Sequence, residues 1–364
     1  MNTSLNTSLT LDTPLQTQPE PLALVPNTGI GQRLPSAFAL KQQIALDPHL
    51  HAQVHSHRSA VRDILNGEDP RLLVVVGPCS LHDPIAALEY AERLAKLAGH
   101  LNGELLLVMR AYVEKPRTTV GWKGLAYDPR LDGSDDMLGG LTLSRELMRE
   151  MLRLGLPLAT ELLQPMAAGY FDDLLSWAAV GARTTESQVH REMVSGLPLP
   201  VGFKNGTDGS IGIACDAMRS AAHPHRHFGI DPQGHPAIIR TEGNPDSHLV
   251  LRGGHSGPNY GRANIEQTLA QLDKARIASR MVVDCSHANS GKDPLRQPEV
   301  FADVVGQRLA GNRALVGLML ESNLFEGCQP IGPDLRYGVS ITDGCLGWEA
   351  TERLLRETAQ RLRG

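Results

Sequence analysis

Short runs of β-branched and apolar residues alternate with longer helical patterns from about residue 72 to the end of the chain. This alternation is typical of parallel βα units. The helical patterns include residues 83–99 and 264–279. We predict an α/β fold, a (β/α)8 TIM barrel. The eight predicted strands are residues 72–76, 105–109, 157–160, 177–181, 200–203, 248–251, 281–284 and 315–320.

Three segments depart from this repeat. Residues 1–35 are rich in Thr, Ser, Gln, Leu and Pro without a period, which predicts a mobile N-terminal arm. Residues 36–71 predict a helical extension of two helices, separated at the Asp47-Pro48 break and ended by Gly67. Alternating apolar residues around a DPQG turn predict an inserted β-hairpin at about residues 224–247. We assign residues 72–364 to the barrel that carries this hairpin.

Composition excludes several classes of protein. No run approaches the roughly 18 consecutive apolar residues of a membrane span, and the first residues lack a signal-peptide pattern, so we expect a cytoplasmic protein. The 5 cysteines are few and odd in number, which favours reduced thiols. A formal net charge of -5 gives no reason to expect nucleic acid or a membrane surface as partner.

A chemically capable residue stands at or just past the end of every predicted strand. In a TIM barrel the carboxyl ends of the strands meet at one mouth, where catalytic side chains come from several strands. We therefore expect these side chains to share one pocket. They are Cys79, Arg110, Glu161, Arg183, Lys204, Arg252, His287 and Glu321.

Six cations lie at or near these strand ends, in a chain that is acidic overall. Such a set suits two phosphoryl groups and a carboxylate, because Arg binds anions in a bidentate way and Lys as a point charge. Each cation alone could be an ordinary surface side chain, but their joint placement favours a binding site. They are Arg110, Lys115, Arg117, Arg183, Lys204 and Arg252.

A second group offers sulfur, nitrogen and oxygen ligands: Cys79, His287, Glu321 and Asp343. This mixture suits a divalent ion of Mn, Fe, Co or Zn better than Mg or Ca, which prefer oxygen. Taken singly, Cys79 is better explained as a buried apolar residue and His287 as a hydrogen-bonded core histidine. Spacing does not reveal such a site, because its members lie far apart in the chain.

Long motifs around these positions resemble the class I 3-deoxy-D-arabino-heptulosonate-7-phosphate (DAHP) synthases of bacteria and fungi. The resemblance runs from about Pro35 to the C-terminus. The motifs are GPCSLHDP (77–84), MRAYVEKPRTTVGWKGL (109–125), GARTTESQVHRE (181–192), GFKNGTDGS (202–210), LRGG (251–254), VDCSHANSGKD (283–293), ESNLFEG (321–327) and SITDGCLGWE (340–349).

This resemblance implies roles for individual residues. Cys79, His287, Glu321 and Asp343 would take one divalent metal ion. Glu161 would lie near the reacting centre. The phosphoenolpyruvate site would comprise Arg110, Lys115, Arg183, Lys204 and Arg252 with the backbone of Gly181 and Ala182, and the erythrose 4-phosphate loop would comprise Lys115, Pro116, Arg117 and Thr118.

The resemblance also implies the reaction. The methylene carbon of phosphoenolpyruvate attacks the aldehyde of erythrose 4-phosphate, water adds to the adjacent carbon, and phosphate leaves by carbon–oxygen cleavage. The metal would act on the aldehyde oxygen as a Lewis acid. The general acid or base is left open between Lys115, His287 and a metal-bound water. As catalytic residues we expect Lys115, Cys79, His287 and Glu161.

Relatives of this kind carry an aromatic amino-acid effector site on the N-terminal extension and the hairpin. Residues 216–230 resemble the tyrosine-sensitive branch most, although His227 stands where relatives often carry an aromatic residue and residues 345–355 resemble the tryptophan-sensitive branch. We expect a homodimer or homotetramer. The candidate effector residues are Leu197, Pro198, His227 and Gly229.

Two other functions fit parts of the pattern. An eight-carbon sugar-acid synthase would use arabinose 5-phosphate instead of the shorter sugar, but the long KPRTTVGWKG loop favours erythrose 4-phosphate. A catalytically silent barrel kept as an aromatic amino-acid sensor would tolerate loss of a metal ligand, whereas all four candidates are present.

Overall fold

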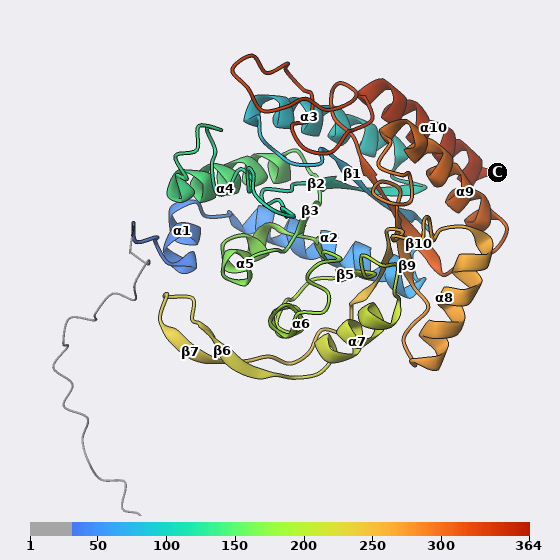
Figure 1. Ribbon diagram of the computed structural model, residues 1–364, viewed down its shortest axis with the longest axis horizontal. Helices are drawn as coiled ribbons and strands as arrows, with labels where there is room; N and C mark the ends of the chain where they lie inside the picture. Colours follow the sequence, from blue (N-terminus) through green and yellow to red (C-terminus); the bar gives the residue numbers. More distant parts are fainter. Residues whose placement is uncertain (1–30) are drawn as a thin grey trace, which may run out of the picture. The chain divides into compact units, whose positions relative to one another are not determined.

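The computed structural model describes residues 31–364, and it contains the predicted closed barrel (Figure 1). Its strands are all parallel and follow one another around the ring in the order β1-β10-β9-β8-β5-β4-β3-β2. Every predicted strand is present. Their bounds are β1 (Leu72–Gly77), β2 (Leu105–Arg110), β3 (Leu158–Glu161), β4 (Trp177–Val180), β5 (Val201–Lys204), β8 (His248–Leu251), β9 (Met281–Asp284) and β10 (Leu315–Glu321).

Eight α-helices surround the strands. Helix α3 begins where Asp83 accepts hydrogen bonds from the backbone of Ile85 and Ala86, with Pro84 in the first turn. Helix α8 ends before its apolar pattern does, since Arg276 adopts a φ of 55°. The helices are α3 (Pro84–Leu101), α4 (Met137–Arg153), α5 (Pro165–Phe171), α6 (Gln188–Ser195), α7 (Gly212–Ala221), α8 (Arg262–Lys274), α9 (Gln297–Leu309) and α10 (Trp348–Arg363), with 3₁₀ turns η1 (Asp172–Leu174) and η2 (Pro294–Arg296).

The helical extension is also present, as α1 (Ala37–Gln43) and α2 (Pro48–Asn66). Asp47 caps α2, and Gly67 ends it in the left-handed region at φ 79°. The arm predicted for residues 1–35 lies almost entirely outside the described residues. No helix in the described part of the chain has both the length and the hydropathy for crossing a membrane.

Helix α2 covers one end of the barrel. Its side chains Val61, Ile64 and Leu65 share a buried apolar cluster with inward-facing strand residues such as Leu73 and Val75. Asn66 also accepts a hydrogen bond from Arg280, directly before β9. The amino ends of the strands are therefore closed, and the opposite end remains for a site.

The predicted hairpin consists of β6 (Arg226–Ile230) and β7 (Pro236–Arg240), which pair antiparallel with His227 opposite Ile239. It lies outside the ring of helices, beyond α5 and α6 (Figure 1). At its turn, the carbonyl of Pro232 accepts a hydrogen bond from the backbone N–H of Phe38 at 3.0 Å. The hairpin and α1 are thus in direct contact.

Candidate active site

A cavity of about 330 Å³ opens at the carboxyl ends of the barrel strands. Every residue predicted to bind substrate lines it, although these residues lie at or after the ends of four different strands. This is the mouth at which TIM barrels carry their catalytic groups. The predicted residues in its wall are Arg110, Lys115, Pro116, Arg117, Thr118, Glu161, Gly181, Ala182, Arg183, Lys204, Arg252, His287, Glu321 and Asp343.

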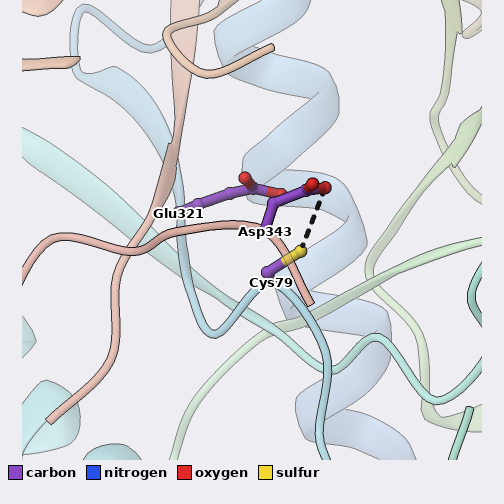
Figure 2. A group of neighbouring side chains, drawn as sticks. All are labelled: Cys79, Glu321 and Asp343. Atoms are coloured by element: carbon purple, nitrogen blue, oxygen red, sulfur yellow. Dashed lines mark hydrogen bonds between the residues drawn. The ribbon is translucent and has the colours of Figure 1, made fainter. Parts of the chain in front are cut away.

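At one side of this cavity, Cys79, Glu321 and Asp343 point their ligand atoms at one another (Figure 2). These atoms all lie within 4.8 Å, and the Cys79 Sγ is 3.6 Å from Asp343 Oδ2. Strands β1 and β10 are neighbours with Gly77 opposite Glu321, which explains how residues from the two ends of the barrel sequence meet. A thiol and two carboxylates form a donor set that fits a borderline divalent metal ion.

His287 lines the same cavity but is not a member of this close group of three. Its backbone has a φ of 55°, an unusual conformation for a residue with a side chain. Its Nδ1 lies 2.7 Å from the Ser286 hydroxyl and 2.9 Å from Asp284 Oδ2. The imidazole ring is therefore positioned by the contacts of its Nδ1 with Ser286 and Asp284.

The thiol of Cys79 is fully buried beside charged groups. Burial and the Glu321 carboxylate raise its pKa to about 12, while the ammonium of Lys115 acts in the opposite direction. Lys115 Nζ lies 3.1 Å from Cys79 Sγ and 3.2 Å from the Cys79 carbonyl. Cys79 is thus a neutral thiol in the protein without metal, and a bound divalent ion would displace its proton.

The opposite side of the cavity is dominated by cations. Lys204 is buried, with its Nζ 3.1 Å from Asp284 and 3.9 Å from Glu161. Burial alone would lower the pKa of Lys204, but these two carboxylates raise it, so the side chain stays charged. Arg183 and Arg252 line the same wall. Such a group of cations, in which Lys204 is buried, Arg252 half-buried and Arg183 exposed, suits an anionic substrate.

The loop of residues 115–118 lies over the cavity between these two sides. Gly121 adopts a φ of 139°, and a Cβ there would come within 2.7 Å of the Arg117 guanidinium. Glycine therefore lets Arg117 lie across the loop backbone. Arg183 also donates to the Thr118 hydroxyl at 3.1 Å, which joins this loop to the cationic wall.

Seven residues of the site were not among the predicted ones. Six of them line the cavity, namely Tyr112, Thr119, Val120, Thr207, Lys292 and Thr342, and Asp284 lies buried beneath it. The strand-end rule takes the residue at or just past each strand end, and at β9 it selected His287. Asp284, the last residue of β9, satisfies the same rule, and its role shows only in its contacts with His287 and Lys204.

Glu114, next to the loop of residues 115–118, is a buried carboxyl group with a raised pKa. Burial raises its pKa to about 7, although hydrogen bonds from the backbone of Leu163 and Gln164 and from the Tyr127 hydroxyl act in the opposite direction. The folded protein therefore holds a proton on Glu114 between the ordinary value of 4.5 and about 7, where the unfolded chain has lost it. Glu114 makes the folded state progressively less stable as the pH rises through this window.

We predict that Glu114→Gln removes this pH dependence. The variant should gain stability relative to the wild type as the pH is raised from 5 to 8, by about 2 to 3 kcal/mol. Urea unfolding of both proteins at the two pH values measures the difference. A constant difference between the two proteins would show that Glu114 does not titrate in this range.

The candidate effector residues lie away from the cavity. Leu197 and Pro198 follow α6, and the Pro198 carbonyl accepts a hydrogen bond from Arg62 of α2 at 2.9 Å. His227 and Gly229 lie on β6. Ser195, at the end of α6, accepts a hydrogen bond from Gly243 and donates to Thr241, just past β7. The segment after α6 and the base of the hairpin are therefore neighbours.

A closed parallel barrel, with a cavity lined by cations beside a thiol and two carboxylates, is typical of a barrel enzyme of the metal-binding type. The chain belongs to the DAHP synthetase I family, whose sequence profile matches residues 43–356.

Relatives of known name agree with this membership. The chain is 53% identical over 328 residues to the Tyr-sensitive phospho-2-dehydro-3-deoxyheptonate aldolase of Escherichia coli K12, covering 89% of this chain and 92% of the relative. It is 48% identical over 336 residues to the Phe-sensitive enzyme of the same organism, covering 92% and 95%. The structure of the aldolase from Francisella tularensis SCHU S4 matches with a TM-score of 0.90 at 43% identity, over 93% of this chain and 99% of that one.

Proposed function

We propose that the cavity condenses phosphoenolpyruvate with D-erythrose 4-phosphate and water to give DAHP and phosphate, the first step of the shikimate pathway. The enzyme is then a transferase, a 3-deoxy-7-phosphoheptulonate synthase. The observation that carries this proposal is the cationic cavity directly beside Cys79, Glu321 and Asp343. Membership of the family and the names of its relatives support the same activity.

The two substrates have distinct places in this proposal. Phosphoenolpyruvate would bind at the cationic wall, where several charges can neutralise its phosphate and carboxylate. Erythrose 4-phosphate would place its phosphate at the loop of residues 115–118, with Arg117 as the main contact, so that its aldehyde end faces Cys79 and Asp343. The phosphoenolpyruvate residues are Arg110, Lys115, Arg183, Lys204, Arg252 and the backbone of Gly181 and Ala182.

A divalent ion of Mn, Fe, Co or Zn, held by Cys79, Glu321 and Asp343 together with His287, would supply Lewis acidity at the aldehyde oxygen. The protein's own residues hold the two substrates in register, and much of the acceleration then comes from orientation and electrostatics. Lys115 is the best placed proton donor for the new hydroxyl, because its ammonium contacts Cys79 Sγ. Glu161, beside Lys204, lies where it can orient the attacking water.

The test is an assay of phosphoenolpyruvate consumption with erythrose 4-phosphate and, side by side, with arabinose 5-phosphate, before and after chelation and metal replacement. We expect turnover with the shorter sugar, its loss on chelation, and recovery with Mn, Fe, Co or Zn. Preference for arabinose 5-phosphate would establish the eight-carbon sugar-acid synthase instead. Failure to consume phosphoenolpyruvate with either sugar would leave the sensor alternative.

Replacing Arg252 tests the anion site. Arg252→Ala should lower kcat/KM for phosphoenolpyruvate on the order of 10²-fold, because a desolvated charge-assisted contact is lost. The KM for erythrose 4-phosphate should change much less, since the loop of residues 115–118 lies elsewhere on the wall. Steady-state kinetics with each substrate varied in turn measure both effects. Unchanged kinetics would exclude Arg252 from the site.

We also propose feedback inhibition by an aromatic amino acid, with tyrosine favoured. The support is the higher identity to the Tyr-sensitive relative than to the Phe-sensitive one, and the contact between the hairpin and α1. The regulatory module would comprise residues 1–71 and 224–243, with Leu197, Pro198, His227 and Gly229 at the effector. Initial rates with tyrosine, phenylalanine and tryptophan added separately decide which one inhibits.

A homodimer or homotetramer is the assembly we propose, and a cytoplasmic location stays a prediction from the sequence. Light scattering of the purified protein at several concentrations measures the assembly. A monomer at all concentrations would contradict the proposal.

A further inference from the structure

Asp284 is completely buried beneath the cavity and contacts both of its sides. One oxygen, Oδ2, lies 2.9 Å from His287 Nδ1 and 3.1 Å from Lys204 Nζ. The other, Oδ1, accepts hydrogen bonds from the backbone N–H of Ser286 at 3.1 Å and from its hydroxyl at 2.7 Å. A single carboxylate thus contacts both His287, a candidate metal ligand, and Lys204, a cation proposed to bind the substrate.

These contacts favour one tautomer of the His287 ring. The Ser286 hydroxyl donates its proton to Asp284, so at 2.7 Å from His287 Nδ1 it can only accept. Asp284 Oδ2, the second neighbour of Nδ1, is also an acceptor. A proton on Nδ1 of neutral His287 is therefore favoured, which leaves on Nε2 the lone pair that a metal ion needs.

The same oxygen restrains Lys204. The two carboxylates near its ammonium, Asp284 at 3.1 Å and Glu161 at 3.9 Å, compensate a charge that is buried in the cavity wall. An anion that binds Lys204 competes with Asp284 for this ammonium. Asp284 is then less neutralised, and its interaction with the N–H of His287 becomes stronger.

We propose that Asp284 is a positioning residue that couples the two sides of the cavity: binding of the anionic substrate at Lys204 strengthens metal binding through His287. This inference rests on the function proposed above. A carboxylate that accepts the N–H of a ligating histidine raises the basicity of the ligand nitrogen. By linkage, the metal must strengthen phosphoenolpyruvate binding by the same factor.

The first test is a titration of the full-length, metal-free protein with Mn²⁺, followed by electron paramagnetic resonance of the free ion, with and without phosphoenolpyruvate. In the wild type we expect phosphoenolpyruvate to lower the Kd for Mn²⁺ about 5-fold or more. Asp284→Asn should raise the Kd about 10- to 100-fold and reduce the effect of phosphoenolpyruvate to less than about 2-fold. An Asn variant that keeps the wild-type coupling factor would overturn the proposal.

Two further variants control this experiment. Glu161→Gln removes the other carboxylate near Lys204. Glu161 lies on β3, whereas His287 follows β9. The variant should change phosphoenolpyruvate affinity and leave the Kd for Mn²⁺ alone within about 2-fold. Ser286→Ala keeps the shared carboxylate and should weaken Mn²⁺ binding with the coupling retained, which provides a second measurement if Asp284→Asn folds poorly. Equal loss of coupling in Glu161→Gln would contradict a specific role for Asp284.

The second test needs neither metal nor substrate. In protein labelled with ¹⁵N-histidine, the nitrogen shifts of His287, assigned by their loss in His287→Gln, should show a proton on Nδ1. In Asp284→Asn the ring should populate both tautomers. A proton on Nε2 in the wild type would refute the positioning role even if the enzyme makes DAHP, whereas failure to make DAHP would refute the proposed function alone.

Discussion

Cys79→Ala should lower kcat by about 10³-fold or more, because Lewis-acid stabilisation at the aldehyde oxygen is lost with the metal. The fold should survive, since the Cys79 side chain is fully buried and alanine leaves only a small gap. Metal analysis of the purified protein, circular dichroism and the condensation assay measure metal content, fold and activity separately. Undiminished turnover would remove Cys79 from the metal site.

Cys215→Ala provides the matched control. Cys215 is also buried, but it lies on α7 away from the cavity, so its loss should change packing without changing metal content. The two variants remove the same atom. A difference in activity between them therefore reports the position of the sulfur, and equal losses of activity would point to a general effect on folding.

The fold could be predicted because the barrel strands are buried on both faces. Residues 72–76 read as a continuous apolar run, and such runs separated by helical patterns permit few arrangements other than a parallel barrel. The hairpin was equally visible, since residues 226–240 alternate around a turn signal. The contact between Pro232 and Phe38 could not be predicted, because nothing local in either segment specifies its partner.

Much of the cavity could be predicted for a topological reason. Once the barrel is assumed, residues just past the strands must meet, so Arg110 and Arg252 are brought together whatever their separation in sequence. The same rule gives no distances between the candidate metal ligands. In the structure Cys79, Glu321 and Asp343 form a close group that His287 does not join. These finer relations depend on side-chain conformation, which a strand pattern does not contain.

The residues that could not be identified from the sequence include two buried carboxylic acids. Glu114 and Asp284 stand beside residues that were identified, and each is explained by partners distant in the sequence: Leu163 for Glu114, and Lys204 for Asp284. A carboxylate at such a position looks like any other charged residue in the sequence. Only its burial and its contacts show that it acts through its neighbours.

Lys115→Met should reduce kcat by about 10²- to 10⁴-fold, the range expected when a positioned proton donor is lost. Burial alone would lower the pKa of Lys115, but the carboxylates of Glu321 and Glu161 raise it above its usual range. The side chain is therefore a cation throughout the working pH range, and methionine keeps most of its volume without the charge. Pre-steady-state kinetics with both substrates measure the chemical step directly.

Lys115→Arg distinguishes proton transfer from charge. Arginine keeps a positive charge beside Cys79, but its planar fork is larger than an ammonium and presents its N–H groups in a different geometry. If Lys115 donates a proton, Lys115→Arg should restore substrate affinity, read from KM, but not kcat. Recovery of kcat in the arginine variant would show that only the charge matters, and the proton would then have to come from His287 or a metal-bound water.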